Sequence, residues 1–363
     1  MIVAVIVYVI LILMGLSFRK SKVVTLILLL YSWCIFGLNT YTPDYISYYQ
    51  IFNGTYYGKN IEIGFELINV FFRNLGLNFQ QFRMIWALIY VGLMANFATK
   101  VSSNPNCIFS LMLICPILVD ASGIRSSVAY LLVMNFSLLL REHGWKRRLL
   151  FIFGVIMAST IHISCIFFLI FLLENFTSFK NKKLAVLFFV MVLAIIIKTP
   201  IFSMVCQALY DMTGLYGIQK WLLGSSLNTS PNLVGFLSVA VFLVALVVLS
   251  CFETKYIAES CSEEERKSNV LFLQRLSFHM LYLLPVLMLS IEAQRFMYGS
   301  LLMFHSITSN CFSEGDSSSK FSLKAGLFVV IEVVVLLAMV WVYSYSYKSH
   351  DVYATLYCNY LFN

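Results

Sequence analysis

Long apolar runs separated by short polar segments dominate the pattern along the chain. A helix needs about 20 apolar residues to cross a bilayer, and helices satisfy all their backbone hydrogen bonds within lipid. We therefore expect helices over residues 2–17, 23–38, 80–99, 106–121, 123–140, 184–198, 232–252, 270–289, 297–312 and 325–345. The predicted fold is all-α: a polytopic integral membrane bundle of about 10–12 transmembrane helices that forms one domain over residues 1–363.

The apolar stretch 147–174 can form one long helix or two short helices divided near Thr160–His162. Cytoplasmic loops carry an excess of lysine and arginine, and the most basic segments are residues 18–22, 141–148 and 180–183. All three lie on one side of the membrane only if 147–174 is divided. We therefore expect two short helices there, or a re-entrant hairpin.

Each span crosses the membrane once, so successive loops lie on alternate sides, and this alternation assigns a membrane side to each loop. We expect an external loop with an interfacial helix over 39–79, a second external loop over 199–231 and a cytoplasmic loop over 253–268. The polar residues expected at the outer face are Asp44, Glu62, Glu66, Arg125, His162, Glu292 and Arg295. One face of the membrane is thus expected to gather most of the chemically capable side chains.

Composition agrees with a membrane protein, since 60% of residues are hydrophobic and only 12% are charged. The net charge of +8 is what basic cytoplasmic loops produce, so we expect no nucleic-acid partner. The first apolar run precedes its positive charges, which favours a retained span over a signal peptide. The nine cysteines form no CxxC pair, and no DxD, Walker, GxSxG or HExxH motif occurs. We expect no metal and no cofactor.

Two arginines are expected at the outer face, where interfacial arginines are less common than on the cytoplasmic side. Arg125 begins a span in SGIRSSVAYLL, and Arg295 lies between two spans in SIEAQRFMYG. A guanidinium group binds phosphate oxygens in a bidentate manner, so the pair points to an anionic ligand at the outer leaflet. The alternatives are an interfacial anchor for Arg125 and a local i,i+3 pair with Glu292 for Arg295.

Asp44 follows Thr42-Pro43 in a segment rich in tyrosine. Aspartate is favoured as a helix N-cap, and this role for a short helix over 45–52 is one interpretation. The other is a carbohydrate site, in which the rings of Tyr45 and Tyr48 stack on sugars while the acid accepts hydroxyl hydrogen bonds. Tyrosine is also common at membrane interfaces.

Two further features carry candidate chemistry. His162 lies between two apolar half-segments and can act as a proton acceptor or as a structural hydrogen-bonding group. Glu62, Glu66, Asn69 and Arg73 recur at steps of four, three and four residues, which predicts one polar stripe on a helix. The stripe can be a solvated face, or it can contribute to a site.

Taken together, these residues resemble the EpsG-like branch of the Wzy-type polysaccharide polymerases. The resemblance rests on the order of DYISYYQIFN (44–53), EIGFELI (62–68), GLNFQQF (76–82), SGIRSSVAYLL (122–132) and MASTIHISCIFFL (157–169), with RFMYGSLL (295–302) as a weaker match. The chain departs from the family at Asn39, since many members carry a basic residue shortly before the aspartate. Either another residue takes over that role here, or the substrate differs.

The resemblance implies a glycosyltransferase of the bacterial cytoplasmic membrane that makes O-antigen, capsule or exopolysaccharide. Its substrates would be oligosaccharide repeat units on undecaprenyl diphosphate, joined at the outer face. Arg125 and Arg295 would bind the diphosphate, and Asp44, Glu66 and His162 are the candidate catalytic acids or bases. Tyr45, Tyr48 and Glu62 would contact sugar. A chain-length regulator and a flippase are further candidate partners.

Two other functions stay open at this point. A flippase or other transporter of lipid-linked oligosaccharides would use the same substrate, although transporters often show internal repeats and this chain shows none. A membrane acyltransferase that uses His162 is the third alternative. The sequence favours the polymerase because its polar residues are expected on one face.

Overall fold

The computed structural model describes residues 2–56, 61–142, 144–175, 185, 188–193, 195–196, 199–213, 233–261, 263–287, 294–311, 323–346 and 354–360. These residues form helices joined by short connections, and the predicted all-α class is confirmed. The expected range 180–183 and Glu292 lie outside the described residues, as do parts of 184–198 and the part of 199–231 beyond Thr213.

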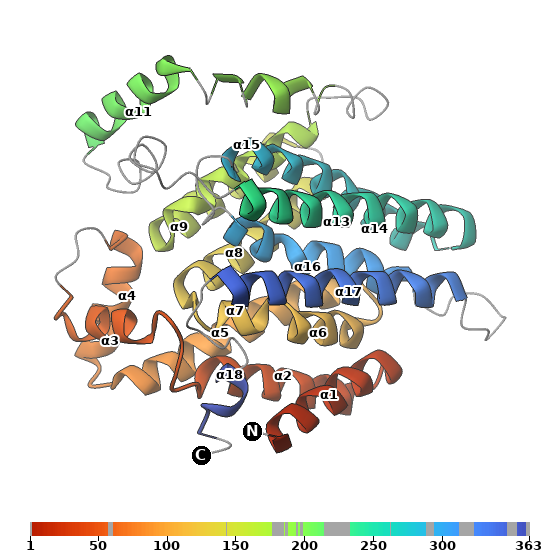
Figure 1. Cartoon of the computed structure of the whole chain (residues 1–363), viewed down its shortest axis with the longest axis horizontal. Coiled ribbons are helices and arrows are strands. Elements are labelled where there is room, and N and C mark those ends of the chain that lie inside the picture. Colours follow the sequence, from red (N-terminus) through yellow and green to blue (C-terminus); the bar gives the residue numbers. More distant parts are fainter. Residues whose placement is uncertain are drawn as a thin grey trace.

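The helices follow one another along the chain (Figure 1) in this order: α1 Ile2–Ser17, α2 Lys22–Gly37, α3 Tyr45–Asn53, α4 Ile63–Asn74, α5 Phe79–Val101, α6 Pro105–Ile114, α7 Ile117–Asp120, α8 Ile124–Ser137, η1 Leu138–Arg141, α9 Trp145–Ile161, η2 Ile163–Asn175, α11 Pro200–Thr213, α13 Leu233–Ser260, α14 Glu264–His279, η3 Met280–Tyr282, α15 Leu283–Leu287, α16 Gln294–Cys311, α17 Leu323–Ser346 and α18 Ala354–Tyr357.

Four described helices are long and apolar enough to cross a membrane: Phe79–Val101, Ile124–Arg141, Leu237–Ser260 and Leu323–Ser344. Shorter apolar helices accompany them, including Ile2–Ser17 and Lys22–Gly37. On α17 the exposed apolar side chains recur every three or four residues, as Leu327, Val330, Val334, Leu337 and Trp341. Such a stripe would be a liability in water but suits contact with lipid. The chain is a polytopic membrane protein.

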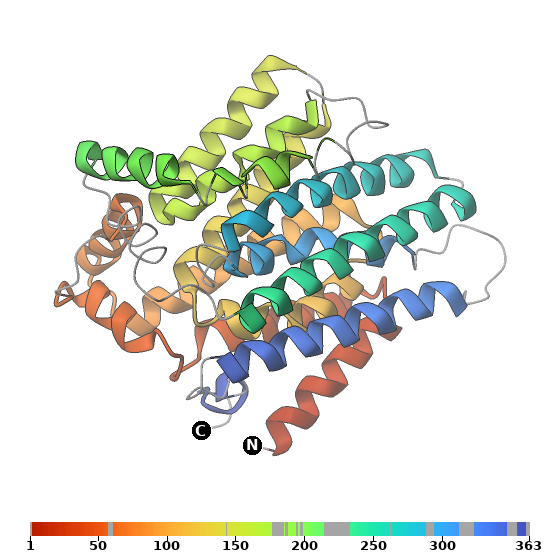
Figure 2. The same ribbon diagram turned by 45° about the horizontal axis from the view of Figure 1, so that its top comes forward.

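Helix α16 forms the centre of the bundle. It contacts α5, α6, α8, α13, α14 and α17, and every residue from Phe296 to Cys311 is buried. Figure 2 shows α13, α16 and α17 crossing the molecule in similar directions, while α3 and α4 project at one end. A helix buried on all sides is typical of the core of a bundle. Arg295 lies in the first turn of α16 and Asn310 in its last turn.

The end of the bundle away from α3 and α4 is held by hydrogen bonds between the ends of helices. Asn310 Nδ2 donates to the Val101 carbonyl oxygen at 2.9 Å, and Arg266 Nε donates to the Asn310 carbonyl oxygen at 2.9 Å. Asn106 Nδ2 donates to the Phe18 carbonyl oxygen at 2.6 Å. The basic segment 18–22 and the start of α14 thus lie at this end.

Several expected elements differ in their boundaries. The stretch 147–174 is divided at His162, as the two-segment interpretation requires. The expected span 106–121 is divided too: α6 ends at Ile114, and α7 follows Pro116, which lacks the backbone N–H that a continuous helix needs.

The range 253–268 is not a loop, which corrects the expectation. Helix α13 continues to Ser260 and α14 begins at Glu264. Pairs on the helix surface favour these extensions, namely Lys255 with Glu259 at 3.9 Å and Lys267 with Glu264 at 3.0 Å. The polar residues of this range are therefore helical, and they extend α13 and α14 beyond their apolar segments.

Candidate functional site

Glu62 joins three separate elements at the end of the bundle where α3 and α4 lie. It occupies the N-cap position of α4, and its Oε2 forms an ion pair with Arg125 Nη1 on α8. Its Oε1 lies 3.3 Å from His162 Nδ1 and accepts a hydrogen bond from the Ile163 backbone N–H at 3.2 Å. Glu62 thus connects α4 to α8 and to the junction of α9 with η2.

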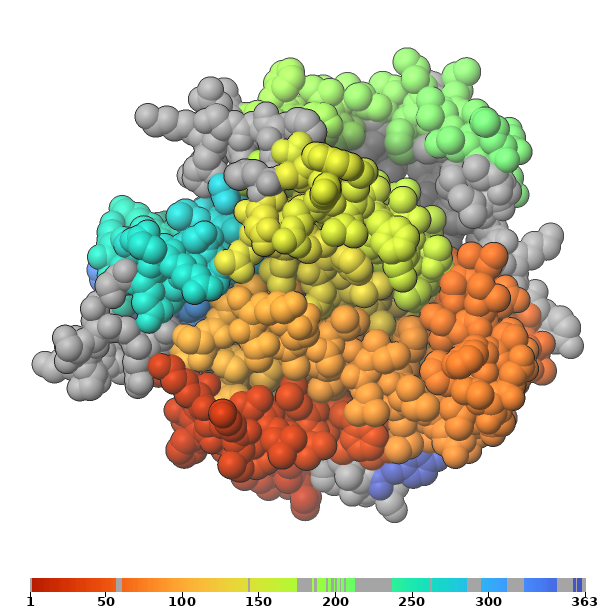
Figure 3. All heavy atoms as spheres, turned by 180° about the vertical axis from the view of Figure 1, so that it is seen from behind, coloured from red at the N-terminus to blue at the C-terminus, as the bar shows by residue number. Residues whose placement is uncertain are grey.

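A glycine allows this contact between α4 and α9, which Figure 3 shows beside each other on the molecular surface. A Cβ atom on Gly64 would lie 2.3 Å from Thr160 Oγ1 and 2.8 Å from the Thr160 carbonyl oxygen. Only a residue without a side chain fits there. The close approach brings the N-terminus of α4, and with it Glu62, to His162.

The environment of Glu62 favours its charged form. Burial alone would raise the pKa of its carboxyl group, but the interactions with His162 and with the Arg125 charge lower it, and the net pKa lies below the ordinary value. Arg125 also lies over the Phe65 ring, 5.9 Å from its centroid. Its Nε atom is buried without a hydrogen-bond partner among the described residues, so the guanidinium group retains donor capacity.

A second arginine–carboxylate pair lies at the same end of the bundle. Arg295 Nη2, on α16, is 3.6 Å from Asp44 Oδ2 at the start of α3. Asp44 occupies the N-cap position of α3, but its side chain makes no capping hydrogen bond. The side chains are 27% and 35% exposed, so this pair is accessible to a ligand. The structure therefore favours a role for Asp44 toward Arg295 over a role as a cap.

Of the two predicted sugar-stacking tyrosines, Tyr48 is buried, whereas Tyr45 is half-buried. Tyr48 is buried, and its ring packs edge-on against Phe65 with centroids 5.9 Å apart. Tyr45 packs edge-on against Phe79 at 5.3 Å. The aromatic core under α3 thus covers the Tyr48 ring, because that face of the helix packs on α4 and α5. Among the described tyrosines of this segment, Tyr41, Tyr49 and Tyr56 are exposed.

The polar stripe of α4 does not act as one surface. Glu66 is exposed and its side chain makes no ion pair or hydrogen bond within the described part of the chain. Arg73 Nη1 donates to the Phe52 carbonyl oxygen at 2.9 Å, and Asn69 Nδ2 donates to the Phe65 carbonyl oxygen at 2.6 Å. The structure thus brings Glu62 into the cluster and leaves Glu66 outside it.

Arg83 is a residue of this region that the sequence analysis did not single out. It is buried on α5 and donates to the Asn39 carbonyl oxygen at 2.7 Å and to the Phe36 carbonyl oxygen at 3.0 Å. Its guanidinium group also lies over the Tyr45 ring, 5.1 Å from the centroid. A cation therefore lies beside Asn39 although that position is itself uncharged. An ionisable residue in an apolar run was the available signal.

The chain segment before Asp44 is also held by the C-terminal residues. Asn39 pairs with Asn359 in an antiparallel bridge, and Thr40 Oγ1 donates to the Cys358 carbonyl oxygen at 3.0 Å. Asn359 Nδ2 donates to the Cys34 carbonyl oxygen at 2.8 Å. Together with Arg83, these bonds fix the start of the loop that carries Asp44.

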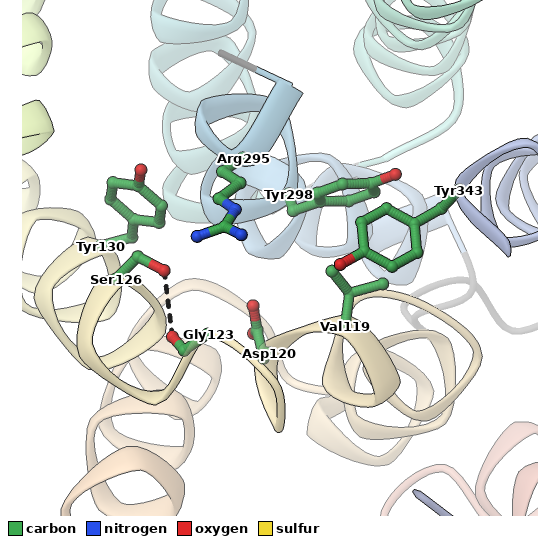
Figure 4. A pocket seen from close by; sticks show the side chains of 8 residues that line it. All are labelled: Val119, Asp120, Gly123, Ser126, Tyr130, Arg295, Tyr298 and Tyr343. Carbon is green, nitrogen blue, oxygen red and sulfur yellow. Dashed lines mark hydrogen bonds between the residues drawn. The ribbon is translucent and has the colours of Figure 1, made fainter. Parts of the chain in front are cut away.

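A small pocket adjoins the Asp44–Arg295 pair, lined by Val119, Asp120, Gly123, Ser126, Tyr130, Arg295, Tyr298 and Tyr343. Figure 4 shows the Arg295 guanidinium and the Asp120 carboxylate directed toward one another across it. Asp120 is buried, and its Oδ2 accepts a hydrogen bond from the Tyr90 hydroxyl at 2.7 Å. Asp120 lies inside an expected span, so the sequence analysis did not single it out.

Fold and site together define a class: a polytopic helical membrane protein with two arginine–carboxylate pairs at one end of its bundle. In the described ranges no group of three or more histidine, cysteine, aspartate or glutamate side chains could hold a metal ion. The chain belongs to the EpsG family, whose family model matches residues 22–362. This is a Wzy-like family of polysaccharide polymerases. Comparisons with curated proteins and with solved structures find no match.

Proposed function

We propose that this protein joins oligosaccharide repeat units carried on undecaprenyl diphosphate, at the outer face of the bacterial cytoplasmic membrane. Membership of the EpsG family supports a polysaccharide polymerase. The observation that carries the finer proposal is the pair of arginines, Arg125 and Arg295, at the end of the bundle opposite the basic segment 18–22. Basic segments mark the cytoplasmic side, so the arginines would face outward.

The proposed reaction transfers a growing glycan from its lipid diphosphate to a hydroxyl group of the next lipid-linked unit. The acceptor oxygen forms a bond to the anomeric carbon, the bond from that carbon to the diphosphate oxygen breaks, and the diphosphate leaves with the electron pair. Arg125 and Arg295 bind the leaving diphosphate, since fixed cations stabilise the charge that develops there. The hydroxyl proton passes to a carboxylate base.

Asp44 is the carboxylate best placed to act as that base. Glu62 is occupied by Arg125, His162 and the Ile163 N–H. Within the described part of the chain, Asp44 forms an ion pair with Arg295 only, and its side chain is 35% exposed. A partly exposed ion pair is worth about 0–1 kcal/mol. A diphosphate group can therefore displace Asp44 from Arg295 and leave its carboxylate available to the acceptor hydroxyl.

His162 and Glu62 form the supporting part of the proposed site. The Glu62 carboxylate fixes the Arg125 guanidinium and lies 3.3 Å from the His162 ring nitrogen. His162 is half-buried, and Tyr130 packs edge-on against its ring at 5.8 Å. In this proposal Glu62 positions the groups that meet the substrate. The exposed Tyr41 and Tyr49, with the half-buried Tyr45, take the sugar contacts, and Tyr48 does not.

The glycan made by a strain that lacks this protein tests the proposal. Loss of a polymerase leaves single repeat units on the cell surface, because flipping and transfer continue. Loss of a flippase instead leaves the lipid-linked units on the cytoplasmic side. Surface-exposed single units that return to long chains upon expression of the wild-type protein would support the proposal. Units trapped inside the cell would contradict it and favour the flippase.

A further inference from the structure

The pocket beneath Arg295 has the size of one small polar group. Its cavity volume is about 10 Å³, which is close to the space of a single water molecule. A sugar ring does not fit, but one exocyclic group of a sugar does. Tyr298 and Tyr343 form one wall, with their rings edge-on at 5.8 Å, and both are buried.

Asp120 gives this pocket its chemical character. The residue is only 8% exposed, and the Tyr90 hydroxyl donates to Oδ2. Among the described residues, no hydrogen bond to Oδ1 accompanies it. The carboxylate is directed at Arg295 (Figure 4). A buried carboxylate is costly unless its oxygens accept hydrogen bonds, so the pocket favours a ligand that donates one.

The size and polarity of the pocket select between kinds of ligand. A phosphate group is too large for a cavity of about 10 Å³. An apolar group would leave Asp120 Oδ1 without a hydrogen-bond donor. A hydroxyl group can donate its hydrogen to Asp120 while its oxygen accepts from the Arg295 guanidinium, which carries several N–H donors.

We propose that this pocket is a subsite for one hydroxyl group of the lipid-linked sugar, with Asp120 as the specificity-determining residue. The inference rests on the proposed function and deepens it: Arg295 binds diphosphate on the Asp44 side and orients a sugar hydroxyl on the Asp120 side. The loss of one hydrogen bond to a charged group weakens binding roughly tenfold to hundredfold.

The test uses the purified full chain and the lipid-linked repeat unit extracted from a strain that lacks this protein. The half-saturating concentration of that unit is measured twice, by thermal stabilisation in detergent and by polymer formation in liposomes. Asp120→Asn keeps an oxygen acceptor for the Tyr90 hydroxyl but turns an NH₂ group toward the pocket. We expect both half-saturating concentrations to rise tenfold or more, with kcat within a few-fold of wild type. Asp211→Asn, on the exposed face of α11, is the matched control and should change neither.

Each outcome decides the proposal. If Asp120→Asn binds like wild type, the pocket holds a structural water only, and the proposal is overturned. If kcat falls while half-saturation is unchanged, Asp120 acts in the chemical step and the assignment as a binding residue is wrong. If the wild type is stabilised by the lipid-linked unit but forms no polymer, the polymerase function fails while the binding comparison still decides the subsite.

Discussion

Arg295 Nη2 lies 3.6 Å from Asp44 Oδ2, and this contact ties the central helix α16 to the start of α3. Two sequence-based alternatives had separated these residues. In one, Asp44 caps its own helix, but its side chain makes no capping hydrogen bond. In the other, Arg295 pairs with Glu292, which lies outside the described residues. The observed pair combines the strongest candidate base with a candidate diphosphate ligand.

We predict that Asp44→Asn and Asp44→Ala both reduce polymer formation about a hundredfold or more, since neither side chain can accept a proton as a base. Chain length in a complemented deletion strain is the measurement. Glu66→Gln is the matched control, because Glu66 is exposed and outside the ion pairs. Near-wild-type chains from Asp44→Asn would instead indicate a helix cap, whose loss in Asp44→Ala costs about 1 kcal/mol.

The lowered pKa of Glu62 predicts that part of the free energy of unfolding depends on pH. A carboxyl group whose pKa is lowered in the folded state stabilises the fold above its unfolded pKa, near 4.3, and this contribution is lost as the pH falls through the folded value. We expect Glu62→Gln to be less stable than wild type by about 1–3 kcal/mol at pH 7, and the difference to shrink below about pH 4. Thermal unfolding in detergent measures it, and an equal difference at both pH values would contradict the assignment.

Gly64 should be intolerant of any side chain. The Cβ atom of Gly64→Ala would overlap Thr160, and such overpacking typically costs 1–3 kcal/mol. We expect lower thermal stability and a loss of polymer formation, since the shift moves Glu62 away from His162. Gly92→Ala is the control, because among the described residues no atom beyond its own helical turn and chain neighbours lies within 4 Å of a Cβ at that position. Equal behaviour of the two variants would show that the α4–α9 contact does not hold the site.

The orientation of the bundle can be measured with single-cysteine labelling in whole cells. Tyr56 is exposed near the end of α3, and Glu264 is exposed at the start of α14, at the opposite end of the bundle. We expect an impermeant thiol reagent to label Tyr56→Cys and to leave Glu264→Cys unlabelled until the membrane is permeabilised. The reverse pattern would put the arginine pairs on the cytoplasmic side and remove the basis of the proposed function.

Some of this arrangement could be predicted from the sequence because its signals are local. Apolar runs predict the helices, and the distribution of basic residues requires the division of 147–174, which occurs at His162. The alternation of spans also groups Asp44, Glu62 and Arg295 at one end. These inferences need only the order of charged and apolar segments along the chain.

Other features depend on tertiary contacts that no local pattern encodes. Tyr48 lies in a tyrosine-rich external segment, yet its ring is buried because α3 packs on α4 and α5. In the sequence, Asp120 belongs to an apolar run that predicts one span. In the structure the helix is divided at Pro116, and Asp120 lines the pocket. The sequence likewise shows Arg83 only as a charged residue at the start of a span. Its hydrogen-bond partners are the carbonyl groups of Phe36 and Asn39, which are far from it in the sequence.

Polymerisation by the purified protein in liposomes tests the central claim most directly. With defined undecaprenyl-diphosphate-linked repeats, we predict that the wild type forms polymer and releases one undecaprenyl diphosphate for each linkage. Arg125→Ala should lose activity by about a hundredfold or more, and Arg125→Lys should recover little, since an ammonium group lacks the bidentate geometry of guanidinium. Full activity of Arg125→Ala, or a wild type that releases no lipid diphosphate, would contradict the account.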